Sequence, residues 1–131
     1  FGDYFAHWLS FEKHGASLPK IFHVNWFRKG DDGKFLWPGF GDNMRVLEWM
    51  LKRVTGQVPG IETAIGILPA VSELNTDGLS LSEQSLRDLL AVDISGWRLE
   101  IDAIADYLEE FGDRTPKVLF DELKKTASRL T

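Results

Sequence analysis

The sequence contains no cysteine, and this absence removes several classes of protein at once. Without thiols the chain has no disulfide framework, no zinc ribbon, no iron–sulfur cluster and no thiolate nucleophile. It also lacks an apolar run long enough to cross a membrane and the basic-then-apolar start of a signal peptide. We therefore expect a protein of the reducing cytoplasm that does not associate with membranes.

The sequence also lacks a surplus of positive charge. The formal net charge is −5, which argues against general binding to nucleic acid. The charge is unevenly spread, because residues 20–45 carry a local balance of +2 while residues 71–131 carry −6. The relatively basic part of an acidic molecule is compatible with an anionic ligand that binds there.

The remaining composition is that of a globular domain. Of the 131 residues, 44% are apolar and 27% charged, and the length is sufficient for one core. No repeat, low-complexity tract or clear linker interrupts residues 1–131, which we take as a single unit. The sequence begins at Phe1 and not at a methionine, and we expect it to be a piece of a longer polypeptide.

Hydrophobic periodicity predicts short strands followed by helices. A helix is expected over residues 3–14, then an extended run over residues 20–27 whose side chains alternate in polarity. Asp32-Gly33 is a hairpin signal before a short returning strand, residues 35–37. Asp42 or Asn43 then caps a helix to about Val54, whose buried stripe is expected to be Val46, Leu47, Met50, Leu51 and Val54.

The second half of the chain is predicted to be mainly helical. Residues 64–68 form a short strand, and Ser80 with Glu83 resembles a capping box before the next helix. Two more helices follow, one ending near Gly112 and one starting with Thr115 as its cap. The fold class is mixed α/β: a hairpin and helix (residues 20–54) and a helical tail (residues 80–131), as a fragment of a larger α/β nucleotide-binding domain.

Residues 35–43 combine three aromatic rings with two glycines, a proline and an amide, a mixture that suits a purine base. Stacking on the faces of a base needs rings, and Phe27, Phe35 and Phe40 can be brought together by a hairpin. The amide of Asn43 can both donate to and accept from the edge of a base. Gly41 has no Cβ and lets the backbone approach a ligand.

The same pattern has a purely structural interpretation. Rings at the end of a hairpin are commonly part of a core, and Asn or Asp before a helix commonly serves only as a cap. Spacing alone does not separate these two interpretations.

A longer resemblance favours the ligand-binding interpretation. Residues 19–29, 33–43 and 45–49, from Pro19-Lys20-Ile21-Phe22-His23 through Trp37-Pro38-Gly39-Phe40-Gly41-Asp42-Asn43 to Glu48-Trp49, resemble GTP-dependent phosphoenolpyruvate carboxykinase. The resemblance extends back through residues 2–9 and, more loosely, forward through residues 63–69 and the helical tail. The chain is similar to the C-terminal portion of such an enzyme.

The resemblance implies a guanine site and a cofactor set. The family's guanine-contacting phenylalanines fall on Phe27, Phe35 and Phe40, its asparagine falls on Asn43, and an acidic residue is usual at Asp42. With Gly41, these residues form the expected site for GTP or GDP. The implied reaction, part of gluconeogenesis, converts oxaloacetate and GTP to phosphoenolpyruvate, GDP and carbon dioxide.

The resemblance also implies a divalent metal, manganese or magnesium, for the phosphate chemistry. The sequence contains no G-x-x-x-x-G-K-S/T phosphate loop. We expect the metal ligands, the phosphate loop and the substrate-binding arginines to lie upstream of Phe1. We therefore assign no catalytic residue and no metal ligand to this chain, and expect the isolated piece to be inactive.

Two other functions remain open from the sequence. One is a stand-alone helical module that binds a protein partner and no nucleotide, its aromatic residues forming a core. The other is a reader of single-stranded nucleic acid through stacked rings, which the −5 charge and the absence of a basic track disfavour. The expected partners are guanine nucleotide and the remainder of the enzyme.

Overall fold

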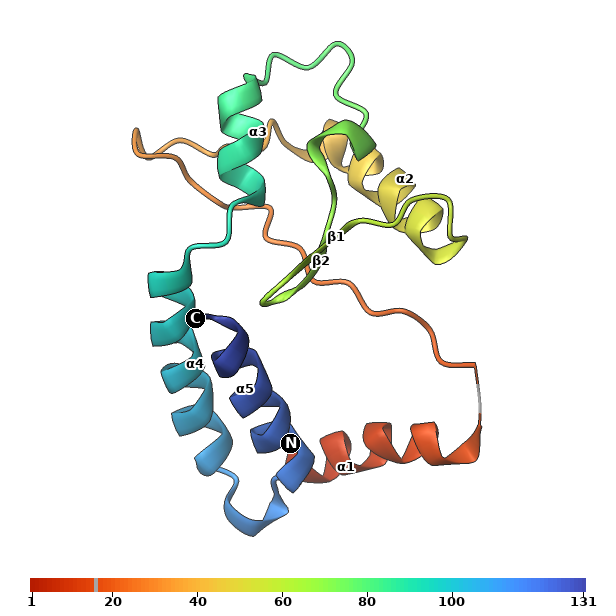
Figure 1. Ribbon diagram of the computed structural model, residues 1–131, viewed down its shortest axis with the longest axis vertical. Helices are drawn as coiled ribbons and strands as arrows, with labels where there is room; N and C mark the ends of the chain where they lie inside the picture. Colours follow the sequence, from red (N-terminus) through yellow and green to blue (C-terminus); the bar gives the residue numbers. More distant parts are fainter. Residues whose placement is uncertain (16) are drawn as a thin grey trace. The chain divides into compact units, whose positions relative to one another are not determined.

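The computed structural model describes residues 1–15 and 17–131, and Figure 1 shows their mixed helical and extended structure. The described residues form five α-helices and one two-stranded antiparallel sheet. The elements are α1 (Gly2–Ser10), α2 (Asn43–Val54), β1 (Ile61–Thr63), β2 (Gly66–Leu68), α3 (Glu83–Leu90), α4 (Ile94–Glu109) and α5 (Lys117–Arg129). The predicted mixed α/β class is confirmed.

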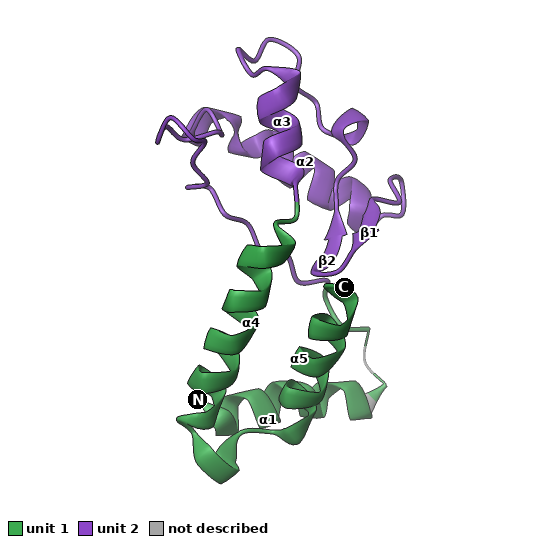
Figure 2. Ribbon diagram, turned by 60° about the vertical axis from the view of Figure 1, so that its left-hand side comes forward, with its two compact units in different colours: residues 1–19, 92–131 green, residues 20–91 purple. Residues whose placement is uncertain are grey.

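The chain divides into two compact units, coloured separately in Figure 2. Lys20–Ala91 contains α2, the β1–β2 sheet and α3, while Phe1–Pro19 together with Val92–Thr131 contains α1, α4 and α5. Helix α3 thus groups with the residues before it and not with α4 and α5. The expectation that residues 1–131 act as one unit stays a prediction.

The core of the Lys20–Ala91 unit lies between α2, α3 and the segment that joins the sheet to α3. Trp49, Leu74 and Leu86 are buried there, and Phe22 packs its ring edge-on against Trp49. The predicted stripe of α2 is wrong in part. Its side chains at Leu47, Leu51 and Val54 are exposed, whereas Val46 and Met50 are half-buried. Because the large Trp49 indole is buried, the buried face of α2 lies about one residue before the predicted stripe.

The strand predicted over residues 64–68 is one half of a small hairpin. β1 pairs with β2 in the register Ile61↔Leu68 and Thr63↔Gly66, so residues 64 and 65 form the turn and not the strand. Gly60 precedes β1 with a φ of +66°, a conformation that disfavours side chains. A Cβ at Gly60 would also lie 2.5 Å from Cγ2 of Ile67, which excludes any larger residue without a shift of the hairpin.

A single carboxylate joins three segments of this unit. Glu73 accepts hydrogen bonds from the indole of Trp49 at 2.8 Å and from the backbone N–H groups of Gly60 at 3.1 Å and Ala70 at 3.2 Å. The indole hydrogen bond lowers the pKa of Glu73 most; burial opposes it, and the two backbone N–H groups and the charge of Arg53 lower it further. The ionised form of Glu73 therefore stabilises the fold.

We expect Glu73→Gln to lower the unfolding midpoint at neutral pH, because the new amide group would direct N–H donors at the N–H donors that Glu73 now binds. Since the folded pKa lies below its ordinary value, this contribution is complete above the ordinary glutamate pKa and is lost as pH falls through the folded pKa. Thermal unfolding of the two proteins across that acid range is the measurement. A difference that stays constant with pH would contradict the assignment.

The predicted strand over residues 20–27 does not form a ladder. Its exposure does alternate as expected, with Phe22, Val24 and Trp26 half-buried and the residues between them exposed. The described residues supply only one bridge nearby, Lys29↔Phe35, so this segment has no partner strand. The alternation follows side-chain packing, while a strand also requires hydrogen bonds to a neighbour.

Helix α3 begins two residues later than the Ser80 capping box predicts. The hydroxyl of Ser82 accepts a hydrogen bond from the backbone N–H of Ser85 at 3.0 Å, which makes Ser82 the cap and Glu83 the first helical residue. Leu81 before the cap and Leu86 in the first turn both belong to the apolar cluster. They occupy the positions of a hydrophobic staple, which favours Ser82 over Ser80.

In the other unit, α4 and α5 lie side by side and antiparallel (Figure 1). Ile101, Leu108 and Leu130 are buried, and the Arg98 guanidinium donates two hydrogen bonds to the carbonyl of Leu130. The predicted Thr115 cap is wrong. Its hydroxyl donates to the carbonyl of Leu108 at 2.7 Å and so ties the loop to the end of α4.

Helix α1 packs at the loop that joins α4 to α5. The Phe1 and Phe111 rings lie 6.0 Å apart, and a Cβ at Gly2 would clash with the backbone of Arg114. The helix predicted over residues 3–14 is confirmed in place, although its last turn, Phe11–His14, is a 3-10 helix. In the described part of the chain, no helix has both the length and the apolar character needed to cross a membrane.

Candidate functional site

Two of the three predicted phenylalanine rings meet on the surface. The ring centroids of Phe27 and Phe35 are 5.8 Å apart and the planes are inclined at 63°, an edge-to-face pair. Phe27 is 70% exposed and Phe35 is 55% exposed. Apolar rings left in water by the Lys20–Ala91 unit are available to a flat ligand, and they are not part of its core.

Local hydrogen bonds fix the segment that carries this pair, residues 27–36, which we call the arm. The side-chain oxygen of Asn25 accepts from the backbone N–H of Phe27 at 2.9 Å, which turns the chain before the arm. Across the turn, Gly30 donates to the carbonyl of Lys34 at 3.0 Å. The predicted hairpin is therefore present as one bridge and a turn, and the returning strand over residues 35–37 is not formed.

An arginine anchors the base of this arm to α3. The guanidinium of Arg28 donates to the carbonyls of Leu89 at 3.1 Å and Ala91 at 2.9 Å. These carbonyls lie at the C-terminal end of the helix, where partial negative charge favours a cation. Arg28 thereby connects the position of the ring pair to the core of the unit.

A lysine occupies part of the surface of Phe35. The ammonium of Lys29 lies 5.5 Å from the ring centroid, within the range of a cation–π contact. The ring of Phe35 thus contacts the ring of Phe27 edge-to-face and the ammonium of Lys29 through a cation–π contact. A positive charge beside the rings is suited to a ligand that carries phosphate groups.

Phe40 stands apart from the other two rings. Its side chain is 93% exposed, and within residues 1–15 and 17–131 no ring contact joins it to Phe27 or Phe35. Gly39 precedes it with a φ of +131° and ψ of −164°, a backbone conformation that only glycine adopts readily. The 3-10 turn Phe40–Asp42 then leads directly into α2.

The amide of Asn43 lies at the first residue of α2 and is bound to a tryptophan. The indole N–H of Trp37 donates to the side-chain oxygen of Asn43 at 2.9 Å. Trp37 is only 7% exposed, so this hydrogen bond forms at the edge of the core. The pairing holds the amide at the N-terminus of α2, where the backbone N–H of Asn43 donates to the carbonyl of Phe40.

Asp42 precedes α2 but does not cap it with its side chain. Its carboxylate accepts from the Arg45 guanidinium at 3.1 Å, and Arg45 also donates to the backbone carbonyl of Asn75 at 3.0 Å. The start of α2 is therefore tied to the loop that follows the core residue Leu74. Gly41 is exposed, and a Cβ there would meet no atom within 4 Å, so open space adjoins the backbone.

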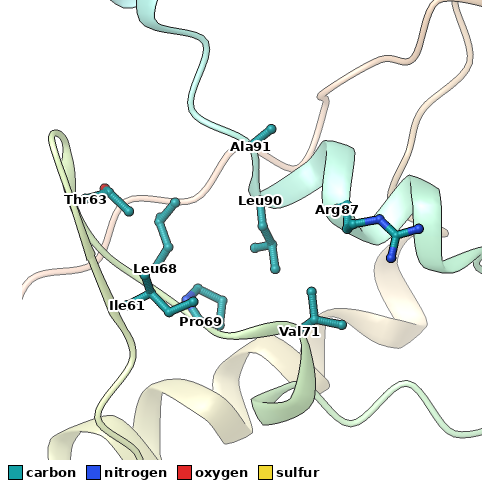
Figure 3. A pocket seen from close by; sticks show the side chains of 8 residues that line it. All are labelled: Ile61, Thr63, Leu68, Pro69, Val71, Arg87, Leu90 and Ala91. Atoms are coloured by element: carbon teal, nitrogen blue, oxygen red, sulfur yellow. The ribbon is translucent and has the colours of Figure 1, made fainter. Parts of the chain in front are cut away.

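A hollow of the Lys20–Ala91 unit lies away from these residues. Figure 3 shows it between the β1–β2 hairpin and α3, where the side chain of Leu90 points toward Pro69 and Val71. Its volume is about 170 Å³, whereas sites for drug-sized ligands measure roughly 300–1,000 Å³. No predicted site residue lines it, and we do not assign the nucleotide to it.

The described residues do not supply the donor set that a divalent metal requires. Among them, no group of three or more His, Asp or Glu side chains is arranged to hold a metal ion. The described side chains therefore do not form a metal site.

Two residues of the site were not predicted in their roles. The sequence predicts Trp37 as one of three rings suited to a base and Arg28 as part of the stretch that resembles the family, without the contacts that either residue makes. An indole N–H and a guanidinium both need acceptors when they are packed, but the pattern does not say which acceptor. The sequence therefore carried no signal for these two contacts.

Comparison with known proteins covers nearly the whole chain. Residues 1–129 match the family described as phosphoenolpyruvate carboxykinase C-terminal P-loop domain. The chain is 48% identical over 128 residues to phosphoenolpyruvate carboxykinase (GTP) of Chlamydia muridarum, covering 97% of this chain and 21% of that protein. The enzyme of the same name from Chlamydia felis is 51% identical over 122 residues, covering 92% of this chain and 20% of that protein.

A relative from another genus gives a similar result. Phosphoenolpyruvate carboxykinase (GTP) of Treponema pallidum, strain Nichols, is 47% identical over 131 residues, or 98% of this chain and 21% of that protein. The chain thus spans about a fifth of the length of the curated relatives it matches. The resemblance that begins in residues 2–9 and continues through the aromatic segment is confirmed, and the chain belongs to the GTP-dependent phosphoenolpyruvate carboxykinase family.

Proposed function

We propose that this chain is the guanine-recognising C-terminal segment of a GTP-dependent phosphoenolpyruvate carboxykinase. The observation that carries the proposal is the solvent-exposed ring pair Phe27 and Phe35, in a chain that belongs to this family. The exposed ring of Phe40 and the amide of Asn43 at the start of α2 complete the proposed site, with Gly41 and Asp42 between them.

The geometry is suited to a base that stacks and is read at one edge. An aromatic–base stack contributes about 1–3 kcal/mol, and it requires an uncovered ring face. Asn43 supplies a polar group at the start of α2, three residues after Phe40, and open space adjoins Gly41. Lys29 places positive charge near the rings, where the phosphates of a nucleotide would be attracted.

In the complete enzyme we propose the decarboxylation and phosphorylation of oxaloacetate with GTP, giving phosphoenolpyruvate, GDP and carbon dioxide. The part of this chain is to bind and orient the guanine, so that the γ-phosphate is held at a constant position relative to the rest of the enzyme. Phosphate binding and metal binding are not assigned to these residues. The proposed partners are guanine nucleotide and the remainder of the carboxykinase, and the proposed location is the cytoplasm.

We expect Asn43→Ala to reduce the preference for GTP over ATP. In the protein expressed from the complete reading frame that encodes this sequence, kcat/KM with GTP should fall about 5- to 150-fold, because a buried polar contact with the base is lost. The activity with ATP should change much less, since adenine does not use this contact. Steady-state rates with both nucleotides give the ratio directly.

A matched variant separates recognition from stability. Gln57→Ala removes a carboxamide that donates to the hydroxyl of Thr55 at 2.9 Å beyond the C-terminal end of α2, away from the proposed site, and should leave the nucleotide preference unchanged. Full retention of the GTP preference by Asn43→Ala would overturn the assignment of Asn43. If the unaltered protein bound no nucleotide and self-associated as its concentration rose, the alternative function, a protein-interaction module, would be favoured instead.

A further inference from the structure

The hydrogen bond between Trp37 and Asn43 determines which end of the Asn43 amide is engaged. An indole nitrogen can donate a hydrogen bond but cannot accept one. An amide nitrogen does not accept either, so only the Asn43 oxygen can face Nε1 of Trp37, at 2.9 Å. The orientation of the amide is thus fixed by chemistry and not by a choice between two equivalent positions.

The other end of the amide is a free donor at the surface. Among the residues that the structure describes, none accepts a hydrogen bond from the NH₂ group of Asn43. The described part of the chain also contains no buried side-chain nitrogen or oxygen without a partner. The NH₂ group is therefore in contact with solvent, three residues after the exposed Phe40 along the chain.

We infer that Trp37 is a positioning residue that makes Asn43 present a hydrogen-bond donor to the base, an inference that rests on the proposed function. The two common purines differ at position 6, where guanine has an acceptor oxygen and adenine has a donor amino group. A fixed NH₂ group pairs with the oxygen and repels the amino group. The selectivity of the site then depends on the indole N–H of Trp37 as well as on Asn43.

Burial of Trp37 makes this orientation costly to reverse. Its side chain is 7% exposed, so its N–H cannot readily exchange the amide oxygen for water. Rotation of the amide by half a turn would place NH₂ against N–H and leave a buried donor unsatisfied, which is unfavourable. Removal of the N–H abolishes that penalty and lets Asn43 present either end.

The test replaces Trp37 by benzothienylalanine, in which sulfur takes the place of the indole N–H and the shape is kept. The protein from the complete reading frame is assayed with GTP and with the triphosphate of 2,6-diaminopurine riboside, which has an amino group at position 6. We expect the kcat/KM with GTP, divided by the kcat/KM with the diaminopurine nucleotide, to fall about tenfold. Most of this fall should come from a higher kcat/KM with the diaminopurine nucleotide. A purely structural role would lower both values by the same factor and would overturn the inference.

The control is Trp49, which is a second buried tryptophan of the same unit. It is 4% exposed and donates its N–H to Glu73 at 2.8 Å, away from the proposed site. The same replacement at Trp49 should weaken stability and leave the ratio unchanged. A fall in the ratio from the Trp49 replacement would overturn the inference.

A second variant changes the atom that meets the base. Asn43→Asp keeps an oxygen for the indole N–H of Trp37 but presents an acceptor where the NH₂ group was. We expect it to prefer the 6-amino nucleotide to GTP; a retained preference for GTP would overturn the inference. If Asn43→Ala itself leaves the GTP preference intact, the proposed function of Asn43 fails, whereas failure of the Trp37 test alone removes only the positioning role.

Discussion

Phe40→Ala is expected to weaken binding of guanine nucleotides about 5- to 150-fold, the loss of one aromatic–base stack of about 1–3 kcal/mol. The same change should leave the unfolding midpoint nearly unaltered, since this ring is 93% exposed and contributes little to the core. Loss of binding without loss of stability is the behaviour of a ligand-contacting residue. Equilibrium titration with GDP and thermal unfolding of the same protein samples measure the two quantities.

Two further variants at Phe40 separate stacking from general apolar contact. Phe40→Trp keeps a π-face and should retain affinity, whereas Phe40→Leu keeps apolar surface without a ring and should lose most of it. If Phe40→Leu bound GDP as well as the unaltered protein, the ring would have no stacking role.

Trp49→Ala is expected to have the largest effect on stability. Its side chain is 4% exposed at the centre of the cluster with Leu74 and Leu86. Truncation of a buried tryptophan costs about 3–5 kcal/mol, a large share of the 5–15 kcal/mol that holds a typical domain together. Removal of the indole also takes away the strongest hydrogen-bond partner of Glu73.

Hydrogen exchange in the protein from the complete reading frame would localise this effect. Amides of α2 and α3 should lose protection in Trp49→Ala, because both helices pack on the missing ring. Leu51→Ala is the matched control, two residues later on the same helix with a side chain that is 67% exposed. Equal loss of protection in both variants would show that the core is not centred on Trp49.

The agreement between sequence and structure was best where the signal is local. Helix α4 carries Trp97, Ile101 and Leu108 at helical spacing, and the structure buries Ile101 and Leu108 as that spacing predicts. Prediction of the N-cap residue was less reliable, because Ser80 and Ser82 are equally good caps by residue type. The staple between Leu81 and Leu86 decided between them, and it depends on which leucines join the core.

The candidate site shows the same difference between local sequence signals and contacts made only on folding. The motif that contains Phe27, Phe35, Phe40 and Asn43 could be located from residue order alone, because a long match is specific. The contact between Phe27 and Phe35 required a turn to bring the two rings together, and the contact from Trp37 to Asn43 has no periodic signature. The strand expected over residues 20–27 illustrates the opposite case, since alternation was present but the described residues contain no partner strand for it.

Family membership, the mixed α/β class and the helices of the C-terminal half were accessible from residue order, because motifs and periodicities are written along the chain. The buried face of α2, the anchoring of Arg28 on α3 and the orientation of the Asn43 amide became known only from the folded chain. Each of these depends on a partner that folding brings near. A pattern names the groups that need partners, and packing in three dimensions selects which partner each one receives.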